Sequence, residues 1–258
     1  MCTQGSPPLR VLTLLLTIAL LTSLGAPATA DSFLTDETFF PVYEEQMARL
    51  EALSWDSTGQ ALAALDEESD PLFHMRLITQ AYFHWAMEPE TEELRQEFLD
   101  ALGERTADSL YDYLPLLDFG YALMVLDDDL NGLWFLEKAR WLPPQEAPES
   151  EQAPPVEERD EPALFLALAL CYAQTDAFLF GNPWPETTNL KREAVLNVTK
   201  AADSASRSPN KLAYAAGLAA VLDYLSYYEG FTQPLEEAGV YSRVDALWAD
   251  TEDSGEWQ

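Results

Sequence analysis

YLPLLDFGYALMVLDDDLNGLWFLEKARWLPP, residues 113–144, is the stretch of this chain with the most regular plan. Apolar and small residues recur in it at three- and four-residue steps, first over 116–123 and again over 132–139. Such spacing places each set on one face of an α-helix. An acidic turn separates the two predicted helices. Gly120 is small enough to let a neighbouring backbone come close, so we expect the helices to cross there.

The order of these residues resembles a tetratricopeptide repeat, a helix–turn–helix unit of about 34 residues with small residues at its crossing. The resemblance is carried by Leu116, Phe119, Gly120, Leu123, Gly132, Leu136, Ala139 and Pro144. The unit before is a looser match, through Tyr82, Trp85, Leu94, Phe98 and Ala101. A later unit fits through Ala169 and Ala194, but with an insertion between them. The resemblance implies an all-α fold of stacked antiparallel helix pairs, a TPR-like α-solenoid; the alternative is an irregular helical bundle.

Helices are predicted along most of the chain, and strand signals are almost absent. The predicted ranges are 39–54, 58–68, 71–87, 90–103, 107–127, 130–142, 162–179, 187–206, 210–229 and 242–250. Successive first helices of pairs start at intervals close to the repeat length, which favours stacked pairs over one closed bundle.

Residues 1–30 have the form of a signal peptide. Arg10 precedes an apolar run, Val11–Leu24, and Ala28-Thr29-Ala30 supplies the small residues that a signal peptidase selects. The run is shorter than the about 20 residues needed to span a bilayer. We therefore expect cleavage near Ala30, no retained membrane anchor, and a periplasmic or secreted protein.

The remaining chain divides by composition into four segments. Helical repeats are predicted over 31–142 and again over 163–250. Between them, residues 143–162 are rich in proline and glutamate and are expected to form a mobile loop. Residues 251–258 are expected to be a disordered tail.

The charge balance argues against a nucleic-acid partner. The chain has 45 acidic and 14 basic residues and a formal net charge of −31. Binding to phosphate requires lysine and arginine. A protein or peptide partner with an apolar or basic surface is the expectation instead.

Residues that carry catalysis or bind metals are sparse. Cys171 lies in an apolar helix and is expected to be a small buried residue. His74 and His84 are too far apart on one helix to share a metal, and His84 with Glu88 supplies only two ligands. Residues 127–132 match the opening of a calcium loop, but its twelfth position is a lysine, and a helix–helix turn with Asp129 as the N-cap is the simpler interpretation. No cofactor is predicted.

Helical repeat proteins bind partners on the surface lined by the first helix of each pair, and the resemblance places that surface. The candidate partner-binding residues are Phe83, Met87, Leu117, Tyr121, Met124 and Leu170. They form either a groove for an apolar or amphipathic peptide or part of the core.

We expect a non-catalytic protein-interaction or scaffolding module. The alternatives are an enzyme or accessory subunit of cell-envelope metabolism, whose site would lie where the proline-rich loop folds over the helices, and an acidic cation-binding protein.

Overall fold

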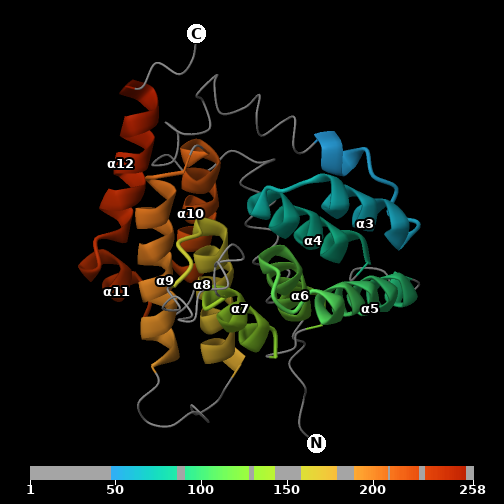
Figure 1. The fold of residues 1–258 in the computed structure, drawn as a ribbon. Coiled ribbons are helices and arrows are strands. Elements are labelled where there is room, and N and C mark those ends of the chain that lie inside the picture. The colour runs from blue at the N-terminus through green and yellow to red at the C-terminus, as the bar shows by residue number, and fades with distance from the viewer. Residues whose placement is uncertain are drawn as a thin grey trace, which may run out of the picture.

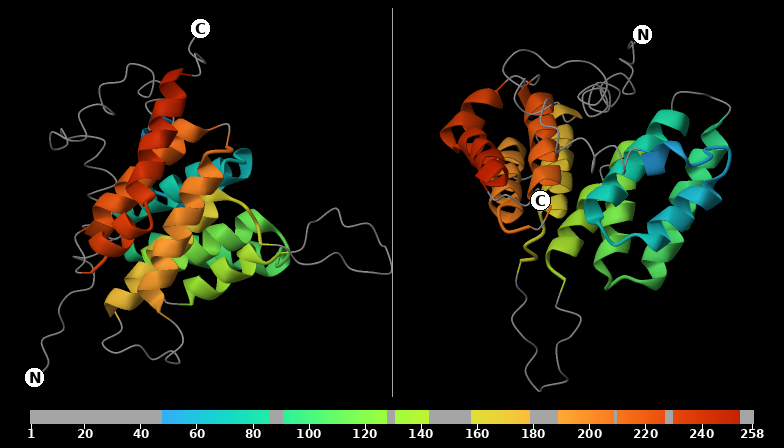
Figure 2. Two further views of the ribbon diagram at one scale, coloured as in Figure 1. Left: turned by 90° about the vertical axis from the view of Figure 1, so that its left-hand side faces the viewer. Right: turned by 90° about the horizontal axis from the view of Figure 1, so that it is seen from above.

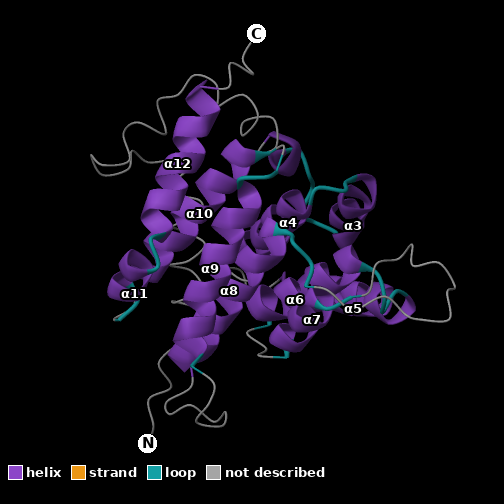
Figure 3. Cartoon of the chain, turned by 60° about the vertical axis from the view of Figure 1, so that its left-hand side comes forward, coloured by secondary structure: helices purple, strands orange, loops and turns teal. Residues whose placement is uncertain are grey.

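A computed structural model of the chain describes residues 48–85, 91–127, 131–142, 158–178, 189–208, 210–226 and 230–253. These residues contain helices and no strand (Figures 1 and 3). The helices are α3 (Thr58–Glu67), α4 (Pro71–Trp85), α5 (Glu92–Asp108), α6 (Tyr113–Leu126), α7 (Gly132–Arg140), α8 (Pro162–Phe178), α9 (Leu190–Ala205), α10 (Lys211–Ser226), α11 (Thr232–Glu237) and α12 (Val240–Asp253). The prediction of an all-α fold is confirmed for this part of the chain.

Helices α6 and α7 form the hairpin expected from the sequence, and they touch at two glycines. A Cβ atom added to Gly120 would lie 2.9 Å from the carbonyl oxygen of Gly132. A Cβ atom added to Gly132 would lie 2.4 Å from the carbonyl oxygen of Gly120. The two backbones are therefore in direct contact, as the glycine spacing predicts, and any side chain at these positions would force them apart.

The helices fall into two adjoining groups, α3–α7 and α8–α12 (Figure 2). From α3 to α10 each helix contacts the next one in the chain, as in the pairs α6–α7 and α8–α9, and α11 contacts α12 and α9. The helices α4, α6, α8 and α10 also contact one another in series. Their apolar faces thus meet in one continuous core that runs through both groups.

Helix α5 is longer and α6 shorter than predicted. The sequence pattern placed the end of α5 at Gly103, but this glycine lies inside the helix, where the Phe119 ring packs 3.3 Å from its Cβ position. The helix continues to Asp108. Helix α6 then begins only at Tyr113, with Pro115 in its first turn, where proline is tolerated.

The C-terminal end also differs from the prediction. The short helix α11 was not predicted, and glycines in left-handed conformations flank it: Gly230 with φ of 88° and Gly239 with φ of 66°. Gly239 stands just after the helix, the position where glycine commonly ends one. Helix α12 extends to Asp253, into the segment expected to be a disordered tail.

Candidate functional site

The predicted partner-binding face is largely buried. Leu117, Tyr121, Met124 and Leu170 are at most 3% exposed, and Phe83 is partly buried against the core. Met87 lies outside the described residues. The groove alternative therefore does not hold for the four buried residues, because the neighbouring helices α4, α6 and α8 pack on one another and cover that face. Of the two interpretations left open by the sequence, the core is the one observed.

One polar contact lies within this face. The hydroxyl of Tyr121 lies 3.0 Å from Oγ1 of Thr79, and both residues are buried. Burial raises the pKa of Tyr121 to about 12, although the hydrogen bond to Thr79 opposes the shift. The hydroxyl therefore stays neutral and serves to satisfy its buried neighbour on α4.

The only described pair of acid–base groups in the core is His74 with Asp118. Both side chains are 2% exposed, and Nδ1 of His74 lies 2.8 and 3.0 Å from the two carboxylate oxygens. Nε2 of His74 lies 3.0 Å from the carbonyl oxygen of Glu68 and donates a hydrogen bond to it. Every polar atom of the ring is thus engaged. The pair ties the end of α3 to α4 and α6 rather than facing a substrate.

The pKa values of this pair follow from burial and mutual attraction. Burial alone would lower the pKa of His74, but the hydrogen bond and charge of Asp118 outweigh it and raise that pKa. Burial raises the pKa of Asp118 in spite of the bond from His74.

The other chemically active residues do not form a site. Cys171 is buried, and burial raises the pKa of its thiol to about 12, so it is an unreactive core residue, as expected from the sequence. His84 is exposed and stacks on Trp55 with ring centroids 4.9 Å apart, whereas Glu88 lies outside the described residues. So does Asp129, the expected N-cap of the acidic turn. The described residues contain no group of three or more potential metal ligands.

The end of the proline-rich segment is bonded to two helices. Residues 143–157 lie outside the described residues. Glu158, however, binds Nζ of Lys200 through both carboxylate oxygens, at 2.6 and 2.7 Å, and also binds Nε of Arg140. The amide of Arg159 donates to the carbonyl oxygen of Arg140 at 2.8 Å. Glu158 and Arg159, in the segment 143–162 that was expected to form a mobile loop, therefore have defined contacts with α7 and α9.

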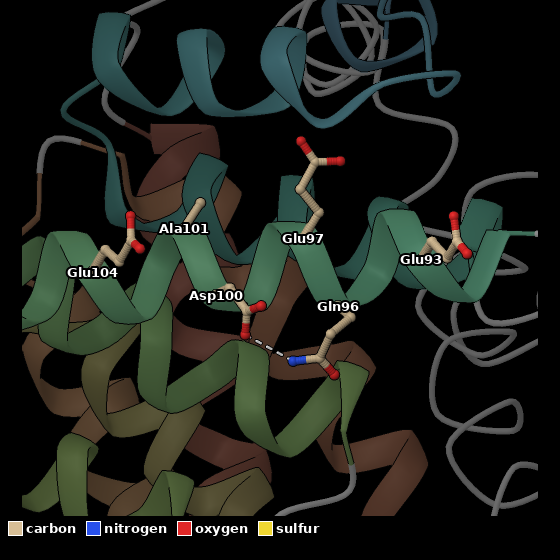
Figure 4. Close-up of a pocket in the computed structure, with 6 residues that line it drawn as sticks. All are labelled: Glu93, Gln96, Glu97, Asp100, Ala101 and Glu104. Carbon is tan, nitrogen blue, oxygen red and sulfur yellow. Dashed lines mark hydrogen bonds between the residues drawn. The ribbon is translucent and has the colours of Figure 1, made fainter.

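Exposed carboxylates line one face of α5. Glu93, Glu97, Asp100 and Glu104 border an open surface hollow of about 460 Å³, with Gln96 and Ala101 between them (Figure 4). Asp108 continues the same face one turn after Glu104. We call these five acids the acidic row. Among the described residues, none of them lies within ion-pair distance of a lysine or arginine, since Arg95 and Arg105 pair with Glu92 and Asp66 instead.

An exposed aromatic surface adjoins the end of this row. Of the five large apolar side chains exposed in the described residues, four lie at the α5–α6 turn, on α7 or directly after it: Leu110 (38%), Tyr111 (73%), Trp134 (59%) and Trp141 (47%). We call these four residues the aromatic stripe. Trp134 and Trp141 are seven residues apart, about two helical turns, and so lie on the same side of α7.

Lys138 lies near two rings of the aromatic stripe, and Arg140 lies near a third. Nζ of Lys138 lies 5.3 Å from the ring centroid of Trp134 and 5.8 Å from that of Tyr111. The guanidinium of Arg140 similarly lies 5.4 Å from the Trp141 ring. Cations are attracted to aromatic faces, so these contacts favour the observed positions of the three rings. This surface was not predicted from the sequence.

Comparison with known proteins provides no relative: no family model, no curated protein and no solved structure matches the chain. None of the described helices has the length and apolar character needed to cross a bilayer.

Proposed function

We propose that this protein is an exported, TPR-like helical module that binds another protein and has no catalytic activity of its own. In this proposal the acidic row and the aromatic stripe form the binding surface, in place of the buried first-helix face. The localisation follows from the signal-like residues 1–30.

The order of helix contacts supports the TPR-like part of the proposal. In stacked helix pairs, each helix touches its partner and the equivalent helix of the next pair. Contacts of α4 with α5 and α6, and of α6 with α7 and α8, have this order. The glycine contact between α6 and α7 stands at the crossing of the best-matching unit.

The observation that carries the proposal is the exposure of the aromatic stripe. Tyrosine and tryptophan are enriched at the centres of protein interfaces, where they contribute most of the binding energy. Here three such rings are about half exposed or more on neighbouring elements. His74 and Asp118, which form an acid–base pair in the core of the described residues, and the thiol of Cys171 are instead buried.

Affinity capture with matched variants tests the proposal. The tagged chain would be expressed in its own cells as wild type, Trp134→Ala and Leu196→Ala, cross-linked and purified. Leu196 is the control, because it is also exposed, at 40%, but belongs to α9 and not to the aromatic stripe. We expect a protein that is captured by the wild type and by Leu196→Ala but lost with Trp134→Ala.

Two further results would count against the proposal. Identical proteins captured by all three chains would show that the aromatic stripe binds nothing. N-terminal sequencing of the recovered chain is expected to begin at Asp31, and a start at Met1 would contradict the export part of the proposal.

A further inference from the structure

The acidic row has a defined length and direction on the molecule. Glu93, Glu97, Asp100, Glu104 and Asp108 follow one another along α5, so their Cα atoms extend over about 22 Å at 1.5 Å per residue. Tyr111 lies three residues beyond Asp108, and its ring reaches Lys138 on α7. The row and the aromatic stripe are therefore two parts of one surface, with the apolar part at the C-terminal end of α5.

Charge complementarity limits what this surface can bind. Its acids have no ion-pair partner among the described residues, and Asp100 only accepts a hydrogen bond from Gln96, so a segment with lysine or arginine would find carboxylates to pair with along the row. A second copy of this chain is a poor occupant, because the formal net charge of −31 makes two copies repel each other. Nucleic acid is disfavoured for the same reason.

The aromatic stripe adds a second requirement. The faces of Trp134 and Trp141 each already hold a side-chain cation of this chain, which shows that the rings are placed for cation–π contact. Because these rings are 59% and 47% exposed, they retain surface for a partner's apolar or guanidinium groups. An arginine suits both parts of the surface, since it pairs with carboxylates and stacks on aromatic rings.

We infer that the acidic row and the aromatic stripe together bind a basic, amphipathic segment of a protein partner, rich in arginine and with apolar residues at one end. The cations lie along α5 and the apolar end lies on Tyr111, Trp134 and Trp141. This inference rests on the proposed function and adds the class of partner and its orientation.

Binding of defined peptides to the purified full chain tests this inference. The probe is a fluorescein-labelled peptide of about 16 residues, long enough to follow the row as a helix. It contains arginine along one face and leucine at one end. A second peptide has glutamate in place of every arginine and keeps the same leucines. Affinity is measured by fluorescence anisotropy at low and high salt.

Matched variants separate the effect of the acidic row on peptide binding from the effect of the net charge of the protein. Glu97→Gln combined with Glu104→Gln removes two charges from the row. The control, Glu67→Gln combined with Glu236→Gln, removes two exposed charges from α3 and α11. Trp134→Ala tests the stripe, with Leu196→Ala as its control. Circular dichroism checks that each variant is folded.

The expected result is binding of the arginine peptide only. The row variant weakens it by about three- to tenfold at low salt, because each exposed ion pair contributes little. Trp134→Ala weakens it by about thirtyfold or more, as for an aromatic residue at an interface centre. Both control variants stay within about twofold of wild type.

Other outcomes overturn the inference. Equal weakening by the row variant and its control would show attraction to the overall charge alone. Equal binding of the glutamate peptide would refute charge complementarity, and a dimer in sedimentation velocity that Trp134→Ala dissociates would make a second copy the occupant. If no peptide binds while Trp134→Ala still loses a captured protein, the partner class is wrong and the proposed function stands.

Discussion

Replacing Gly132 by alanine should destabilise the protein through the contact between α6 and α7. The new Cβ would lie 2.4 Å from the carbonyl oxygen of Gly120, whereas carbon and oxygen normally approach no closer than about 3.3 Å. The obstacle is backbone, so the helices must separate by about 1 Å. Overpacking of this kind costs about 3 kcal/mol, the upper end of its usual range, and lowers Tm by about 6–12 °C in a chain of this size.

Two other glycines provide controls for the same substitution. A Cβ at Gly59 meets nothing within 4 Å, so Gly59→Ala should stabilise α3 by up to about 1 kcal/mol through helix propensity. A Cβ at Gly103 meets only the Phe119 ring, at 3.3 Å. That ring is partly exposed and can shift, so Gly103→Ala should change stability by less than about 1 kcal/mol in either direction.

Urea unfolding followed by circular dichroism measures all three variants. The order of stability expected is Gly59→Ala, then Gly103→Ala, then Gly132→Ala. If Gly132→Ala is as stable as Gly59→Ala, the two backbones do not touch, and the account of the α6–α7 crossing is wrong.

Three further predictions concern charged groups. Asp118→Asn should cost about 3–5 kcal/mol, because His74 loses its buried carboxylate partner. The pKa of His74 is raised in the folded protein, so the stabilising effect of the pair is complete below the unfolded pKa of about 6.5 and is lost as pH rises through the folded pKa. The difference in the free energy of unfolding between wild type and Asp118→Asn should therefore shrink from about pH 6 to about pH 10. A difference that grows over this range would contradict the argument. Glu158→Gln should lower stability by about 1–3 kcal/mol in thermal unfolding, because Lys200 and Arg140 lose the carboxylate that they share. An unchanged Tm would show that the contacts of Glu158 do not stabilise the fold. Sodium chloride raised from about 0.01 M to about 1 M should raise Tm, because the Debye length falls from about 30 Å to about 3 Å and screens the repulsion among the acids; a flat or falling Tm would mean that the acids are compensated locally.

The sequence predicted those parts of the fold that depend on local spacing. Apolar residues at helical intervals predicted most of the helices, and the glycines at 120 and 132 predicted a close crossing. The end of α5 was misplaced because Gly103 is usually unfavourable inside a helix, and only the packing of Phe119 against it explains its position.

The candidate surface needed the tertiary structure. Tyr121 and Met124 have the same apolar character whether they line a groove or fill a core, and only the packing of the neighbouring helices decides between these. His74 and Asp118 are 44 residues apart and belong to no motif, so nothing in the sequence joins them. One feature of the sequence could have indicated the aromatic stripe. Trp134 and Trp141 are seven residues apart, on the side of α7 opposite its small buried residues.

The anchoring of Glu158 and Arg159 has a consequence for protein engineering. Because the amide of Arg159 bonds to the carbonyl of Arg140, the chain on either side of residues 143–157 is held together at the surface of α7 and α9. The entropy of closing a flexible loop rises only slowly with its length, by about 0.6 kcal/mol for each doubling. An affinity tag or a fluorescent reporter inserted within residues 143–157 should therefore leave the helical frame intact, because the residues on both sides of that range stay bonded to each other.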